Sequence, residues 1–121
     1  MNTYPFYKAA TTTTEGFLLL KLDGSGELTP TTADTDVPAG MSENTLVEGQ
    51  VVNLIQSGSG LKFRAEGAIA IGAKLAPSAA TPGYVKTAAS GDRVIGYASQ
   101  AAADGDLFSG ELIQNRETAI A

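Results

Sequence analysis

Apolar and polar residues alternate in short runs along this chain, and glycine or proline separates the runs. In residues 61–66, LKFRAE, the side chains of Leu61, Phe63 and Ala65 would face one side and the charged side chains the other. A period of two over a short run indicates a strand with one buried face. The spacing predicts an all-β fold, a small sandwich or barrel. Further strands are expected at residues 17–22, 46–56, 68–76, 84–88, 93–100 and 107–113.

Residues 23–45 do not follow this pattern. They are rich in Thr, Pro, Gly and Asp and show no apolar period. A connection this long is uncommon inside a compact domain and is usually functional or disordered. With 121 residues the chain has room for one domain. We therefore expect a single β-rich domain over residues 17–121 that contains a long loop at 23–45, with at most one short helix, around residues 99–104.

The N-terminal arm, residues 1–16, contains three aromatic side chains followed by four consecutive threonines. Aromatic side chains are costly to leave in water, so such an arm is expected to lie against its own core or against a partner. Thr and aromatic residues also favour extended backbone, which suits pairing with a strand of another chain. The candidate contact residues are Tyr4, Phe6, Tyr7, Thr11, Thr12 and Thr13.

Composition removes most catalytic chemistry. The chain has no Cys and no His, which excludes disulfides, the usual zinc sites and the Ser-His and Cys-His nucleophile pairs. Its formal charge is -5 at pH 7, which argues against nucleic-acid binding. No apolar run is long enough for a signal peptide or a bilayer span. We expect a soluble protein made in the cytosol that is not an enzyme, with no catalytic residue, cofactor or metal, and no nucleic-acid or membrane partner.

Some motifs nevertheless suggest ligand chemistry. Residues 67–74 have the glycine spacing of a phosphate-binding loop, but Ala73 stands where that loop needs Lys. Residues 34–36 and 104–106 each place two carboxylates close together, but calcium takes at least about six oxygen ligands. The dipeptide Gly-Asp, at residues 91–92 and again at 105–106, precedes a short apolar run each time. That arrangement is typical of a turn, so we interpret the repetition as structural.

Residues 66–113 resemble the C-terminal part of small phage capsid decoration (cement) proteins, including a family formerly of unknown function. The resemblance rests on the order of its elements: a Gly-Ala-Ile strand start, a Lys-Leu pair after a glycine-rich turn, the octapeptide GDRVIGYA, and the heptapeptide AAADGDL. These elements occupy residues 67–69, 74–75, 91–98 and 101–107. The arm and residues 23–45 lie outside the resemblance.

The resemblance implies a structural virion protein that binds the outer surface of a phage capsid. It implies a homotrimer that stabilises the shell by bridging subunits of the major capsid protein, which would be the main partner. An alternative is a carbohydrate-binding or tail-associated β-domain, which would need exposed aromatic side chains in a groove; Tyr84 and Tyr97 are the candidates. A small hydrolase would instead need a carboxylate pair with a raised pKa.

Overall fold

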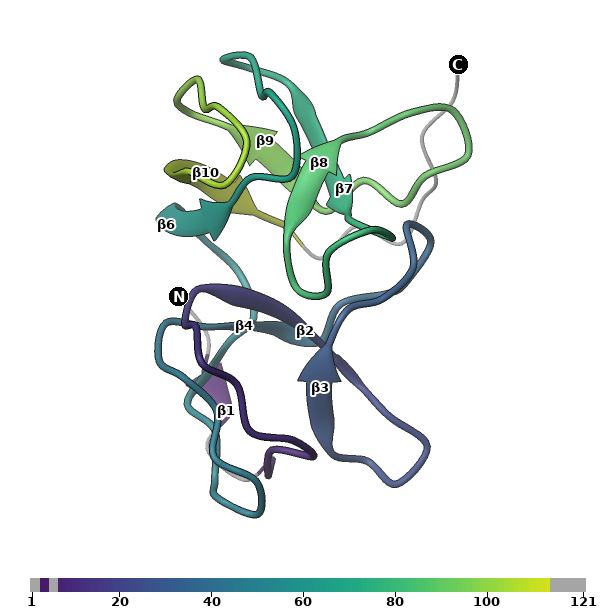
Figure 1. Cartoon of the computed structure of the whole chain (residues 1–121), viewed down its shortest axis with the longest axis vertical. Coiled ribbons are helices and arrows are strands. Elements are labelled where there is room, and N and C mark those ends of the chain that lie inside the picture. The colour runs from purple at the N-terminus through teal and green to yellow at the C-terminus, as the bar shows by residue number, and fades with distance from the viewer. Residues whose placement is uncertain (1–2, 5–6, 114–121) are drawn as a thin grey trace.

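The structure is a computed structural model, and it describes residues 3–4 and 7–113. These residues contain no helix, and their strands form two five-stranded antiparallel sheets. The all-β fold predicted from the sequence is therefore confirmed. Figure 1 shows the second sheet, β6 to β10, above the first along the long axis of the molecule. The strands are β1 (Thr3–Tyr4), β2 (Leu18–Leu22), β3 (Leu28–Pro30), β4 (Gly40–Ser42), β5 (Leu54–Ile55), β6 (Gly58–Arg64), β7 (Lys74–Pro77), β8 (Val85–Thr87), β9 (Gly96–Ala98) and β10 (Leu107–Leu112).

The first sheet has the strand order β1-β5-β4-β2-β3, and the N-terminal arm, which contributes β1, forms two further bridges with it after that strand. Ala9 forms a parallel bridge with Leu28 of β3, while Lys8 forms an antiparallel bridge with Val51. The arm therefore joins the edge strand β3 to the segment before β5. The arm and the first sheet share one buried apolar cluster, which contains Ala9, Leu18, Leu20, Leu28, Leu46, Val52 and Leu54.

The second sheet has the strand order β6-β10-β9-β7-β8. The sheet curls, so that the end of its edge strand β6 meets its other edge strand, β8. Ala65, just after β6, forms a parallel bridge with Val85 of β8, and the Glu66 N–H donates to the Val85 carbonyl (2.8 Å). Inside this sheet the rings of Phe63 and Phe108 pack with centroids 5.9 Å apart. The alternation predicted for residues 61–66 is confirmed, since Leu61, Phe63 and Ala65 are buried.

The expectation of a long loop at residues 23–45 is wrong, because this segment contains β3 and β4. Each strand has three residues, which is too short for a period of two to be visible in the sequence. Glycine is unfavourable inside a strand, so Gly40 also weakens the strand signal in the sequence. Only glycine fits there, however, because a Cβ would collide with the Ile55 carbonyl of β5. Leu28 and Met41 are fully buried and fix the two strands in the sheet.

Other expected elements are shorter than predicted. Residues 46–56 form a strand only at β5, and the rest of that segment is loop. No helix forms at residues 99–104; instead Ala102 forms an antiparallel bridge with Ile69, and the Gln100 side chain accepts the Ser109 N–H (2.8 Å). A helical turn of this length has no stability of its own, so pairing with neighbouring strands prevails.

Both Gly-Asp pairs form the same turn, which confirms the interpretation made from the sequence. Asp92 donates its N–H to the Ala89 carbonyl (3.0 Å), and its carboxylate accepts the Ala89 N–H (2.8 Å). Asp106 makes the equivalent pair of hydrogen bonds with Ala103 (3.1 and 3.2 Å). The glycine before each Asp has a φ of 88° or 84°, a left-handed conformation that glycine adopts without steric cost.

An apolar cluster joins the two sheets. Leu19, Met41 and Ile55 of the first sheet belong to the same buried cluster as Phe63 and Phe108 of the second. Backbone hydrogen bonds cross the same junction: Gly83, before β8, accepts the Leu19 N–H (2.8 Å) and donates to the Thr31 carbonyl (2.9 Å). The two sheets therefore share part of one core, which is how the single domain expected over residues 17–121 would be held together.

Complementary charges surround this junction. Arg64 of β6 donates to the Gly16 carbonyl (2.8 Å) and lies 3.5 Å from the Glu15 carboxylate. That carboxylate accepts the Tyr84 hydroxyl through both oxygens (3.0 Å each). Burial and the neighbouring Glu15 carboxylate raise the pKa of Tyr84. Tyr84 and Arg64, which belong to the second half of the chain, therefore hold the last residues of the N-terminal arm in place.

A second set of contacts ties the segment between β3 and β4 to the second sheet. Lys86 of β8 lies 3.4 Å from the Asp34 carboxylate and 3.2 Å from that of Asp92. Burial alone would lower the pKa of Lys86, but the two carboxylates raise it overall. Arg93 donates its backbone N–H to the Asp34 carbonyl (2.9 Å) and its side chain to the Thr35 carbonyl (3.3 Å). The acidic first half and the basic side chains of the second half thus meet at the junction.

The segment between β3 and β4 is organised by Asp36, and this gives a pH prediction. Its carboxylate accepts the N–H groups of Thr32 and Ala33 (2.9 Å each) and lies 3.2 Å from the Lys21 ammonium. Burial alone would raise the pKa of Asp36, but the hydrogen bonds and Lys21 together lower it below its usual value of 3.8. The stabilisation is therefore complete well above pH 3.8 and is lost as the pH falls through the folded-state pKa.

Asp36→Asn is expected to lower the free energy of unfolding by about 1 kcal/mol at pH 7, because it weakens charge-assisted hydrogen bonds. The difference from the wild type should shrink as the pH falls through the lowered folded-state pKa of Asp36, because the wild-type carboxyl then becomes protonated as well. Urea unfolding of both proteins at pH 7 and at a series of acidic pH values measures this difference. An unchanged difference at low pH would show that the charge of Asp36 contributes nothing.

Candidate functional site

The structure describes most of the arm residues that were singled out as contact candidates. Tyr4 lies in β1, paired with Leu54 of β5, while Phe6 lies outside the described residues. Tyr7 is half-buried against the core of the first sheet. Of the threonines, Thr11 and Thr13 are half-buried and Thr12 is exposed. The described candidates are therefore part of a folded surface, and they do not extend away from the domain.

Hydrogen bonds explain why the threonines of the arm lie where they do. Thr13 accepts the Leu46 N–H on its hydroxyl oxygen (2.9 Å) and donates its own backbone N–H to the Leu46 carbonyl (3.1 Å). The Thr12 hydroxyl oxygen accepts the Glu48 N–H (3.0 Å). The Gly49 N–H donates to the Ala9 carbonyl (2.9 Å). The arm thereby holds the loop between β4 and β5, a loop whose role the sequence did not reveal.

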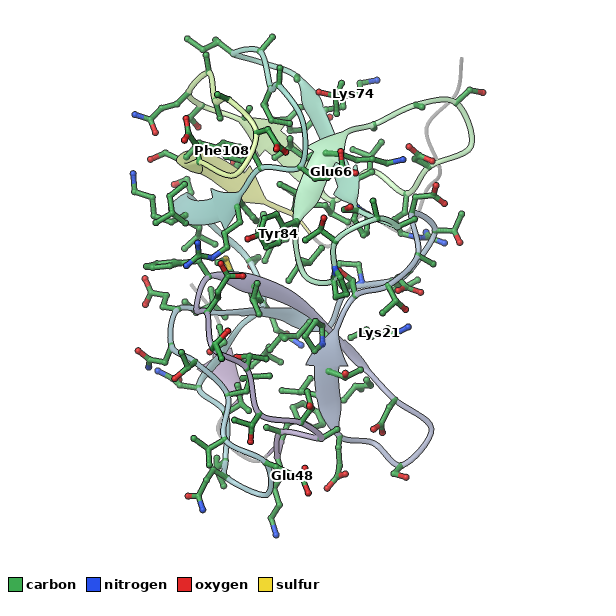
Figure 2. The ribbon with its side chains drawn as sticks, viewed as in Figure 1. Lys21, Glu48, Glu66, Lys74, Tyr84 and Phe108 are labelled. Carbon is green, nitrogen blue, oxygen red and sulfur yellow. The ribbon has the colours of Figure 1, made fainter. Side chains whose placement is uncertain are left out.

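This loop contains a surface hollow of about 320 Å³. Beside it, Val47 and Val51 keep 53% and 57% of their surface exposed, although both are apolar. We call residues 7–14 and 42–53 the arm–loop surface. Glu48, at the tip of its loop, lies at one end of the molecule, and Lys74 of the second sheet lies toward the other (Figure 2). The hollow is lined by Ser42, Asn44, Thr45, Leu46, Val47, Gln50, Val51, Val52 and Asn53.

The two tyrosines considered for carbohydrate binding lie in different settings. Tyr84 is half-buried at the junction, where its hydroxyl donates to Glu15 (Figure 2). Tyr97 of β9 is 38% exposed, between Lys74 of β7 and Glu111 of β10 in the sheet register. Neither tyrosine lines the hollow of the arm–loop surface. A groove built on both rings therefore has no support in the structure, and Tyr97 is the aromatic residue left for such a role.

The motifs with possible ligand chemistry have structural roles. Gly67 and Gly72 both have a φ of 79°, as glycines in turns do, and the Gly67 N–H donates to the Asp104 carboxylate (2.8 Å). The Asp34 and Asp106 carboxylates are engaged with Lys86 and the Ala103 N–H. Within residues 3–4 and 7–113, no group of three or more acidic, His or Cys side chains could hold a metal ion. The same residues include no helix long and apolar enough to cross a bilayer.

Comparison with known proteins identifies the fold. No family model and no curated protein sequence matches the chain. Among solved structures, the chain is similar to the N base of head fiber gp8.5 in bacteriophage phi29, with a TM-score of 0.70 and 16% sequence identity. The similarity covers 93% of this chain and 95% of that chain. The chain therefore has the fold of a phage head-fibre base over nearly its whole length.

Proposed function

We propose that this chain is a structural virion protein that binds the outer surface of a phage capsid through its arm–loop surface. The observation that carries the proposal is the shared fold with a phage head-fibre base over nearly the full length of both chains. The resemblance of residues 66–113 to capsid decoration proteins supports the same role, since it rests on several sequence elements that occur in the same order. The shared fold supports a structural role in a phage virion, and attachment to the shell is the part that we propose.

The arm–loop surface is the part of the molecule best suited to the contact. It combines two exposed valines with a hollow, and its loop carries Glu48, which lies at one end of the molecule (Figure 2). Exposed apolar side chains beside polar ones are typical of protein-protein contact sites. The candidate residues Tyr7, Thr11, Thr12 and Thr13 belong to this surface.

We further propose that the chain acts as a homotrimer that bridges neighbouring subunits of the major capsid protein. Three copies joined together engage the shell through three contacts at once, so modest single contacts add up to tight attachment. The formal charge of -5 favours the outside of a shell, because packaged DNA would repel an acidic protein on the inside. No bond-making chemistry is required of the chain in this role.

Shells that lack this chain, prepared from the phage that encodes it, provide the test. The double variant Val47→Asp/Val51→Asp should lose binding by on the order of a hundredfold, because it places two charges in an apolar contact. Sedimentation of shells with the bound protein measures occupancy. Deleting the arm is a poorer test, because Ala9 is buried and its loss would disturb the fold as well.

Ile71→Asp is the matched control. Ile71 is 72% exposed and lies between β6 and β7, in the second half of the fold and outside the arm–loop surface. This variant should bind shells like the wild type. Equal binding by all three proteins would show that the contact with the shell lies outside the arm–loop surface. A wild type that does not bind shells would overturn the proposed function.

The alternative, a carbohydrate-binding domain, depends on Tyr97 and the Lys74 and Glu111 side chains beside it in the sheet register. An exposed ring flanked by a donor and an acceptor has the chemistry for sugar binding. A glycan array probed with the wild type and Tyr97→Ala distinguishes the two functions. Specific glycan binding that disappears in Tyr97→Ala would favour this alternative.

A further inference from the structure

We propose that the hollow of the arm–loop surface binds an uncharged, extended peptide segment of the major capsid protein through three side-chain amides. This inference rests on the proposed function and adds the chemistry of recognition to it. The amides belong to Asn44, Gln50 and Asn53, all of which line the hollow.

The three amides are available for a ligand. Among the residues that the structure describes, none donates to or accepts from the side chains of Asn44, Gln50 or Asn53. All three residues are exposed. Each carboxamide offers one acceptor oxygen and two N–H donors. The hollow therefore presents both hydrogen-bond donors and acceptors in one place.

The residues that line the hollow carry no charged side chain, although the exposed Glu43 and Glu48 lie between them in the sequence. This is notable in a chain with 13 acidic and 8 basic residues. A phosphate, a nucleic acid or a strongly charged peptide would find no partner of opposite charge there. A neutral ligand with its own donors and acceptors can replace its hydrogen bonds to water with hydrogen bonds to the three amides. The lining side chains therefore offer hydrogen bonds and no ion pair to a ligand, which favours an uncharged polar segment.

Among neutral ligands, peptide backbone fits better than sugar. Sugar sites in proteins rely on an aromatic ring for stacking, and no aromatic side chain lines this hollow. Backbone presents alternating N–H and C=O groups, which pair well with carboxamides. Val47 and Val51 add apolar contacts of the kind that the side chains of an extended segment need. An extended peptide segment satisfies both the polar and the apolar parts of the site.

The test is the triple variant Asn44→Ala/Gln50→Ala/Asn53→Ala, which removes the amides and keeps both valines. Its affinity for shells that lack this chain should fall by about tenfold to a hundredfold, the effect of losing two or three neutral hydrogen bonds. Thermal melting checks that the variant folds, which is expected because all three side chains are exposed. Raising the salt from about 0.05 M to about 0.5 M should change the wild-type affinity little, since no charge pairing is involved.

Photocrosslinking identifies the bound segment. With benzoylphenylalanine at residue 51, irradiation of decorated shells should link the chain to one uncharged stretch of the capsid protein. Crosslinks only to a second copy of this chain, or only to a charged capsid segment, would overturn the inference. So would a triple variant that binds like the wild type while Val47→Asp/Val51→Asp does not bind, although the proposed function would then stand. If the wild type does not bind shells at all, both the inference and the proposed function are wrong.

Discussion

Phe108→Ala is expected to lower the free energy of unfolding by about 4 kcal/mol, the largest effect of any single truncation considered for this protein. Phe108 of β10 is fully buried in the core, where its ring packs against that of Phe63 of the neighbouring strand β6. The same cluster includes Leu19 and Met41 of the first sheet. Removing the ring therefore leaves a cavity that weakens the junction as well as the second sheet.

Leu107→Ala is the matched control for Phe108→Ala. Leu107 is the preceding residue of β10, its side chain is 45% exposed, and its loss should cost less than about 1 kcal/mol. Thermal melting should show a fall of about 15 °C for Phe108→Ala and only a small change for Leu107→Ala. Similar falls for both variants would mean that β10 does not place Phe108 in the core.

The same melting curves test the domain organisation. If residues 17–121 form one domain, the wild type should unfold in one cooperative step, because the apolar cluster spans both sheets. Two separate transitions would show that each sheet forms its own unit.

Gly96→Ala is expected to cost about 3 kcal/mol, although it adds one methyl group. Gly96 lies in β9 between Leu112 of β10 and Leu75 of β7. A Cβ at this position would collide with the Glu111 carbonyl oxygen and lie 2.9 Å from the Glu111 carbonyl carbon. Both atoms belong to the backbone of β10, so relief requires the two strands to separate.

Gly24→Ala is the control for Gly96→Ala. A Cβ at Gly24 would have no atom within 4 Å, so this substitution should change stability by less than about 0.5 kcal/mol. Urea unfolding of both variants measures the difference. If Gly96→Ala were as stable as Gly24→Ala, β9 and β10 would not approach each other closely enough at Gly96 to exclude a side chain.

The regular strands of the second half could be predicted from the sequence. Alternation at Leu61, Phe63 and Ala65 identified β6, and the Gly-Asp pairs identified turns because glycine and aspartate act through local backbone geometry. Local signals of this kind require no knowledge of distant contacts. They are strongest where the chain forms turns and strands of ordinary length.

The first sheet was harder to predict, because its strands depend on contacts with distant residues. β3 and β4 have three residues each, and they are held by Leu28 and Met41 in the core. Ala9 pairs with Leu28, and that pairing closes the sheet. None of these contacts leaves a periodic pattern in the sequence.

The candidate site was predicted in part. The aromatic and threonine content of the arm drew attention to one side of the arm–loop surface. The other side, residues 42–53, was expected to be largely a strand, because Leu46, Val47, Val51 and Val52 are apolar. The arm threonines hold this loop through hydrogen bonds to backbone N–H groups, which any residue can supply. Such contacts cannot be assigned from residue identity alone.

Electron cryomicroscopy of shells with and without this chain tests the central claim most directly. We expect added density on the outer surface of the shell, arranged as trimers, with residues 7–14 and 42–53 against the capsid protein and β9 and β10 away from it. Absence of added density, or density that meets the shell through the second sheet, would contradict this account.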